Sequence, residues 1–235
     1  MKGTKSMFIK LSIWAMGSLA ILLVTGDLAW PKEGEGKKPN DTKAAVTAPV
    51  SPSQREADIS GFRSVRFGMN EKDVEKAVNK DFPNANITRS THPVEKTLTL
   101  AVTVQDLFPE SGPAQVGYIL GHKSQALIQV NVLWSKAINP KSDNATLVAI
   151  ANELKNYFVL QGFESDKMVV NVTLPDGSIL VFRGVDKKGH MVALLLGPVQ
   201  DQKTTEKTDM DFFLRLSYFE NPVAPDIFQI KQGDF

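Results

Sequence analysis

The chain repeats one order of patterns: a stretch with helical spacing of apolar residues, followed by four strand-like stretches. In the first occurrence a helix is expected after Asn70, a suitable N-cap, and before Pro83, which ends it. Its apolar face would comprise Val74, Ala77, Val78 and Phe82. The strand-like stretches that follow are 86–91, 98–104, 115–121 and 128–134.

The second occurrence begins at Ser142 and Asp143, which precede a longer apolar stripe that ends at Gly162. Strands are expected at 167–174, 178–184, 189–196 and 210–219. Two sequences between these strands, Pro175-Asp176-Gly177 and Lys187-Lys188-Gly189, are typical of hairpin turns.

These patterns predict an α+β fold in which two helix-plus-antiparallel-sheet repeats pack their helices on one sheet face. The body would span 61–235, with similar halves at 61–138 and 139–235. Because each half is small for an independent hydrophobic core, we expect the halves to share a core or a continuous sheet.

The first 29 residues have the features of a secretory signal peptide. Lys2, Lys5 and Lys10 precede an apolar run at 11–24, which is shorter than the roughly 20 apolar residues that span a bilayer. Val24 and Gly26 suit a cleavage site. The protein is therefore expected to be periplasmic or secreted. If cleavage fails, the same segment becomes an amino-terminal anchor in the inner membrane.

Residues 30–60 are rich in Pro, Lys and Glu and contain few large apolar side chains. Such a segment buries too little surface to offset the entropy lost on ordering, so we expect a disordered linker. It would serve either as a partly stiff spacer or as a leader without a role of its own.

Composition excludes several classes of function. Hydrophobic residues make up 42% and charged residues 23% of the chain, as in water-soluble proteins, and the formal net charge is +1. The predicted body carries 19 basic and 20 acidic residues. A nucleic-acid-binding role is therefore disfavoured, and membrane association is expected only through an uncleaved amino terminus. Since the chain has no cysteine, disulfides, thiolate nucleophiles and iron–sulfur clusters are excluded.

The segment Phe67-Gly68-Met69-Asn70-Glu71-Lys72-Asp73-Val74 resembles a helix entry of the form G-M-[ST]-x-x-x-V. That entry is found in SmpA/OmlA-type outer-membrane assembly lipoproteins and in beta-lactamase-inhibitor-protein-like proteins. The resemblance implies that Gly68 permits a turn, Met69 fills the core, residue 70 caps the helix and Val74 faces the sheet. It also implies a tandem α+β fold and a non-enzymatic, exported scaffold that binds another protein. The chain departs from the pattern in having Asn70 for Ser or Thr and no cysteine to carry a lipid.

No catalytic or cofactor-binding motif stands out, so an enzyme is not expected and no cofactor is predicted. His92, His122 and His190 have no spacing typical of a metal site. The carboxylate pairs Asp106 with Glu110 and Asp209 with Asp211 are interpreted as solvated surface groups.

Arg63 and Arg66 immediately precede the first helix and are the candidates for binding an anion or a partner carboxylate. The alternative is an edge strand whose arginines pair with surface acids.

Two apolar segments are the candidates for binding a protein partner. Leu107 and Phe108 occupy an otherwise polar loop, and the carboxy-terminal tail carries Ile227, Phe228 and Phe235. The tail would either pack on its own body or add to the sheet edge of a partner.

The sequence therefore predicts an exported, non-catalytic protein-binding or accessory module whose partner is a protein of unknown identity. Two alternatives stay open. One is a small-ligand carrier or hydrolase-like enzyme with a pocket between helices and sheet. The other is a membrane-anchored accessory subunit of an envelope complex.

Overall fold

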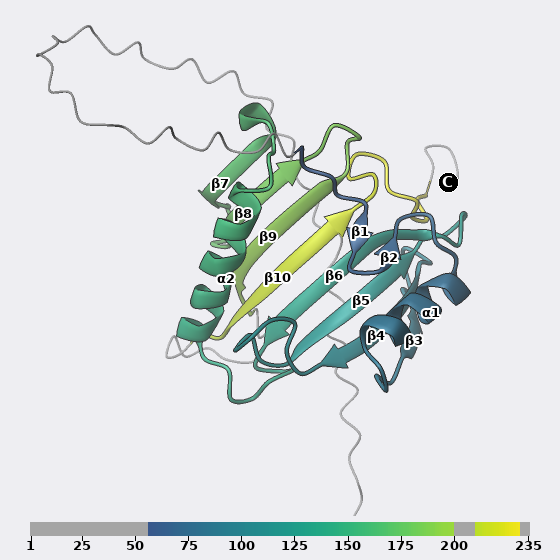
Figure 1. The fold of residues 1–235 in the computed structure, drawn as a ribbon, viewed down its shortest axis with the longest axis horizontal. Helices are drawn as coiled ribbons and strands as arrows, with labels where there is room; N and C mark the ends of the chain where they lie inside the picture. The colour runs from purple at the N-terminus through teal and green to yellow at the C-terminus, as the bar shows by residue number, and fades with distance from the viewer. Residues whose placement is uncertain (1–55, 200–209, 231–235) are drawn as a thin grey trace, which may run out of the picture. The chain divides into compact units, whose positions relative to one another are not determined.

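The computed structural model describes residues 56–199 and 210–230, which belong to one structural unit (Figure 1). The predicted signal peptide, most of the predicted linker and Phe235 lie outside the described residues.

Along the described chain, a short hairpin and a helix precede four strands, and a second helix precedes four more. The elements are β1 (Gly61–Phe62), β2 (Val65–Arg66), α1 (Glu71–Asp81), β3 (Thr88–Thr91), β4 (Leu98–Val104), β5 (Ala114–Leu120), β6 (Leu127–Ser135), α2 (Asn144–Val159), a 3-10 helix (Ser165–Lys167), β7 (Met168–Thr173), β8 (Ile179–Val185), β9 (Met191–Pro198) and β10 (Phe212–Phe219).

Apart from β1 and β2, the strands form one antiparallel sheet of eight strands in the order β3-β4-β5-β6-β10-β9-β8-β7. At its centre β6 pairs with β10, so that Trp134 lies opposite Leu214 and Val132 opposite Leu216. Both α1 and α2 pack on the same face of this sheet (Figure 1). The prediction of an α+β fold with helices on an antiparallel sheet is confirmed, and the eight-stranded sheet is continuous from β3 to β7.

Helix α1 begins as its sequence predicts. Asn70 caps it: its side-chain oxygen accepts the backbone N–H of Asp73 at 3.1 Å, and its side-chain amide donates to the Asp73 carboxylate at 2.7 Å. Gly68 has a φ of 81°, a conformation that favours glycine. Met69 packs against the core and Val74 is fully buried. The structural roles that the helix-entry motif implies are therefore present.

Helix α2 is capped by Asp143, whose carboxylate accepts the backbone N–H of Thr146 at 2.7 Å. Its buried side chains, Leu147, Ile150, Ala151 and Phe158, form one face of the helix. Phe158 stacks on Phe182 of β8 with ring centroids 5.5 Å apart. This packing holds α2 over the β8–β9–β10 part of the sheet.

The described body includes the last residues of the predicted linker, from Glu56 on. Ala57 and Ile59 are buried. The Ala57 N–H donates to the Gly162 carbonyl at 3.3 Å, and the Ile59 N–H donates to the Asp186 carboxylate at 2.9 Å. We refer to residues 56–60 as the lead segment, because it runs into the β1–β2 hairpin.

Candidate functional site

The face of the sheet away from the helices carries its own set of side chains. Because side chains alternate along a strand, the burial of Leu214 and Leu216 on the helix side turns Arg215 to the other side. The strand register places this arginine between Leu133 of β6 and Leu195 of β9. We call this surface the opposite face; its main members are Ile119, Leu133, Arg183, Leu195, Arg215 and Phe219.

The opposite face holds positive charge without a matching negative charge. Among the described strands, none contains an Asp or Glu. Neither Arg183 nor Arg215 forms an ion pair with any of the described residues. Within the described structure, Nε of Arg183 is also buried without a hydrogen-bond partner. Burial lowers the pKa of the Arg215 guanidinium below its usual value. These two groups are therefore partly desolvated cations without a counter-charge from the described residues.

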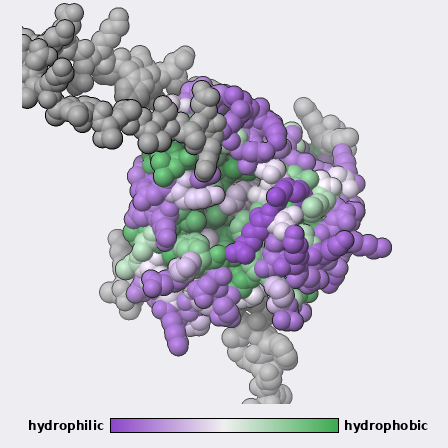
Figure 2. Space-filling model, in the orientation of Figure 1, coloured by the Kyte–Doolittle hydropathy of each residue, from purple (hydrophilic) through white to green (hydrophobic). Residues whose placement is uncertain are grey.

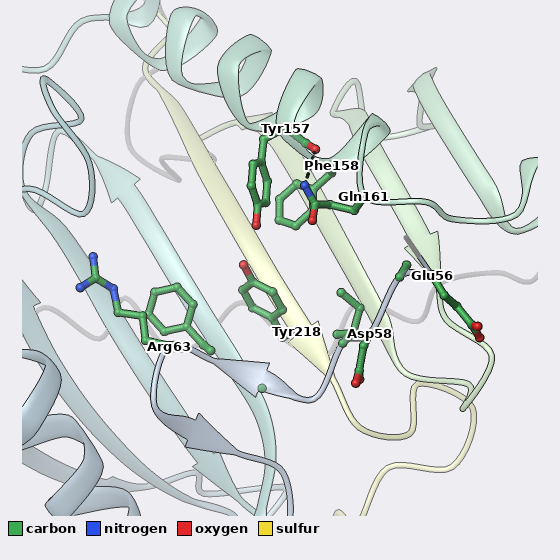
Figure 3. Close-up of a pocket in the computed structure, with 11 residues that line it drawn as sticks. Glu56, Asp58, Arg63, Tyr157, Phe158, Gln161 and Tyr218 are labelled. Carbon is green, nitrogen blue, oxygen red and sulfur yellow. Dashed lines mark hydrogen bonds between the residues drawn. The ribbon is translucent and has the colours of Figure 1, made fainter. Parts of the chain in front are cut away.

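On the helix-bearing face, apolar surface gathers between the two helices and is surrounded by polar side chains (Figure 2). One cleft there, of about 450 Å³, lies between α2 and the lead segment with β1 (Figure 3). We call it the aromatic cleft, because Phe62, Tyr157, Phe158 and Tyr218 line it. The Tyr218 ring lies 5.6 Å from Phe62 and 6.3 Å from Phe158, centroid to centroid.

The hydroxyl groups of Tyr157 and Tyr218 point toward one another across the aromatic cleft (Figure 3). Burial, with a smaller effect from Tyr157, raises the pKa of Tyr218. Its hydroxyl therefore stays protonated at neutral pH. The side-chain amide of Gln161 donates to the backbone carbonyl of Tyr157 at 3.1 Å.

Both predicted anion-binding arginines contact other groups of the same protein. The Arg63 guanidinium lies over the Phe82 ring at 4.8 Å and donates to the Leu107 carbonyl at 2.8 Å. Arg66 donates to the carbonyls of Arg63 and Val65. Carbonyls and a ring, rather than the surface acids considered as the alternative, are their partners here. Anion binding by Arg63 and Arg66 stays a prediction.

The two predicted partner-binding segments lie at opposite ends of β5. Leu107 and Phe108, in the loop before β5, are half-buried and pack against the core. The tail instead contacts the turn after β5 and the loop before β4. Its Phe228 donates its N–H to the Glu95 carbonyl at 2.8 Å and meets the His122 ring edge-on at 5.6 Å.

Within the tail, Ile227 is half-buried, whereas the Phe228 side chain is 42% exposed. The Asp226 carboxylate accepts the backbone N–H groups of Ser124 at 2.7 Å and Lys123 at 3.1 Å. A Cβ on Gly121 would lie 2.3 Å from this carboxylate, so the close approach requires glycine. The tail thus packs on its own body, which is one of the two arrangements expected from the sequence. Phe228 remains accessible.

The three histidines lie in different surroundings. Nδ1 of His92 accepts the Glu95 N–H at 3.0 Å, and the His190 ring lies 5.3 Å from that of Phe67, centroid to centroid. Over residues 56–199 and 210–230, no group of three or more His, Asp or Glu side chains is placed to hold a metal ion.

The carboxylate pairs considered from the sequence differ in their contacts. Oδ1 of Asp106 accepts the Gly112 N–H at 2.8 Å, and Asp211 pairs with Lys136. Asp209 lies outside the described residues.

Comparison of the chain with known protein families, characterised proteins and solved structures finds no match. None of the described helices has the length and apolar character needed to cross a bilayer. What the protein does must therefore be inferred from its own surfaces.

Four residues of the opposite face and the aromatic cleft were not identified from the sequence: Arg183, Arg215, Tyr157 and Tyr218. A signal for the arginines was present, because each interrupts an otherwise apolar strand. No comparable signal marked the tyrosines, since their meeting depends on how α2 lies over β10.

Proposed function

We propose that the protein is an exported, non-catalytic binding module that recognises another protein through the opposite face of its sheet. The observation that carries this proposal is the pair of arginines, Arg183 and Arg215, on a surface whose strands contain no acidic residue. A desolvated cation is stabilised by a carboxylate, and a guanidinium binds a carboxylate through two parallel hydrogen bonds. The partner surface is therefore apolar with at least one accessible Asp or Glu.

The surroundings of the arginines favour a protein over a small anion. Arg215 lies between Leu133 and Leu195, and Ile119 and Phe219 extend the apolar area across further strands. An apolar centre with a few charged groups is the composition of protein–protein interfaces, where arginine is enriched. Both helices and the β1–β2 hairpin lie on the other side of the sheet (Figure 1). On the opposite face Leu195 is 4% exposed, so the proposed partner contacts the partly exposed Leu133, Arg215 and Phe219.

The finer architecture is part of the same proposal. The halves 61–138 and 139–235 would be two similar repeats, each a helix followed by four strands. This is supported by the strand order, in which β6-β5-β4-β3 on one side of the sheet centre mirrors β10-β9-β8-β7 on the other. The resemblance of the helix entry to two families of exported, partner-binding proteins supports the same class of function.

Export is proposed from residues 1–29, which would direct the body to the periplasm or outside the cell. If the segment is not cleaved, the body becomes a membrane-anchored accessory subunit. The mass of the amino-terminal peptide of the native protein distinguishes the two forms.

Charge reversal tests the proposed surface. A partner captured by the wild-type chain from its native compartment is purified, and its affinity is measured for Arg183→Glu and Arg215→Glu. Each variant should bind at least about tenfold more weakly, because reversal places like charges across a desolvated contact. Lys76→Glu, an equal charge change on the exposed side of α1, is the matched control and should bind as the wild type does. Unchanged affinity of both arginine variants would refute the proposal.

A further inference from the structure

The aromatic cleft has the volume of a small-molecule site. Its volume of about 450 Å³ lies within the range of roughly 300–1,000 Å³ that ligand pockets occupy. Aromatic side chains from β1, α2 and β10 line it, so three separate elements hold the rings in place. Rings in such an arrangement bind another ring by offset stacking or by edge-to-face contact.

The charged groups around the cleft already have partners. Glu56 pairs with Lys187 at 3.2 Å, and Asp58 pairs with Lys188 at 3.1 Å. The guanidinium of Arg63 points away from the tyrosines (Figure 3) and is held by Phe82 and Leu107, as described above. A charged ligand would lose its hydration without finding an uncompensated charge in exchange.

Two hydroxyl groups in the cleft have no partner among the residues that the structure describes. Tyr157 and Tyr218 direct their hydroxyls toward one another, and neither makes a hydrogen bond among the described residues (Figure 3). A phenol hydroxyl both donates and accepts, so two of them facing one another can bind a single oxygen atom between them.

We propose that the aromatic cleft binds an uncharged ring compound of about two fused rings that carries one hydroxyl or carbonyl oxygen. The rings of the ligand pack against Phe62, Phe158 and the tyrosine rings, and its oxygen bonds to the hydroxyls of Tyr157 and Tyr218. This site lies on the helix-bearing side of the sheet and is separate from the protein-binding surface proposed above.

A series of probes with one ring system tests the preference for an uncharged oxygen. Binding of 2-naphthol, naphthalene, 2-naphthoate and 2-naphthylmethylammonium to the full chain is measured by NMR titration at neutral pH. The uncharged 2-naphthol should bind about three- to tenfold more tightly than naphthalene, which lacks the oxygen. It should also bind at least about tenfold more tightly than either charged analogue. Equal or tighter binding of a charged analogue overturns the proposal, as does the absence of saturable 2-naphthol binding.

Conservative variants test the two hydroxyl groups. Tyr157→Phe and Tyr218→Phe keep the rings, so each should weaken 2-naphthol binding about three- to tenfold and leave naphthalene binding unchanged. Tyr118→Phe makes the same chemical change at the third tyrosine of the chain, which is fully buried in β5, and should alter neither affinity. If the two cleft variants bind 2-naphthol as the wild type does, the tyrosine hydroxyls do not hold the ligand.

Discussion

Among single residues, Asp186 connects the lead segment to the body. Its carboxylate is buried and accepts the backbone N–H groups of Ile59, Lys188 and His190, each at 2.9 Å. Removing it leaves these donors without an acceptor. We therefore expect Asp186→Ala to lower the free energy of unfolding by about 1–3 kcal/mol, measured by urea denaturation.

Asp176→Ala is the matched control for Asp186. Asp176 is an exposed turn residue whose carboxylate accepts one backbone N–H, at 3.0 Å. Its loss should cost about 1 kcal/mol or less, because it frees one backbone donor instead of three. Equal losses for the two variants would show that the three donors to Asp186 contribute no more than the single donor to Asp176.

Asp226 makes the docking of the tail depend on pH. Burial alone would raise the pKa of this carboxyl, but the N–H groups of Ser124 and Lys123 donate to it and hold its pKa below the usual value. A carboxyl whose pKa is lower in the folded state stabilises the fold above its unfolded pKa of about 3.9. That contribution is lost as the pH falls through the folded pKa.

We expect Asp226→Asn to be less stable than the wild type at about pH 7, and the difference to disappear as the pH falls below about 4. Urea denaturation of both proteins across this range measures the difference. A gap that stays constant, or widens in acid, would mean that the ionised carboxylate does not stabilise the tail.

The roles of residues whose partners are close in sequence were predictable, and the roles of residues whose partners are far along the chain were not. Asn70 was identified as a helix cap because its partner, Asp73, lies three positions away. Phe108 and Arg63 were assigned to binding because their sequence neighbours do not reveal the contacts that these side chains make within the fold. Their contacts join segments more than 40 positions apart, as between Arg63 and Leu107.

At the scale of elements, the two helices depend on their amino-terminal caps. Asn70→Ala and Asp143→Ala each remove the side-chain acceptor of a first-turn N–H, and each should lower the free energy of unfolding by about 1 kcal/mol. Asn79→Ala, at an exposed position inside α1, is the control and should cause no loss, since alanine favours the helix interior. Losses no larger than that of the control would contradict the capping role. Thermal unfolding followed by circular dichroism measures all three.

The strands were predictable as elements, but their arrangement was not. Alternation located the inner strands of the sheet because one side of each packs on the helix-side core, whereas all four residues of the edge strand β3 are exposed. Alternation does not reveal which strands are neighbours. The central β6–β10 pairing joins the last strand of one half to the last strand of the other. The irregularities between Leu180 and Phe182 and between Ile119 and Leu120 also have no local signature.

For the whole molecule, the continuous sheet accounts for how two small halves form one body. The β6–β10 pairing extends along both strands, with Phe213 opposite Ser135 and Phe219 opposite Gln129. Each half thereby gains a neighbour for a strand that would otherwise be an exposed edge. The same continuity places Arg183 and Arg215 on one surface with side chains from the first half, such as Leu133.

Site-specific photo-cross-linking in the native compartment tests most directly whether that surface binds the partner. A photo-reactive amino acid is placed at Asn131, which lies on the opposite face beside Ser217, or at Val148, which is exposed on α2. The account predicts a cross-linked product with one protein from position 131 and none with that protein from position 148. A product from position 148 alone, or from neither position, would contradict recognition through the opposite face of the sheet.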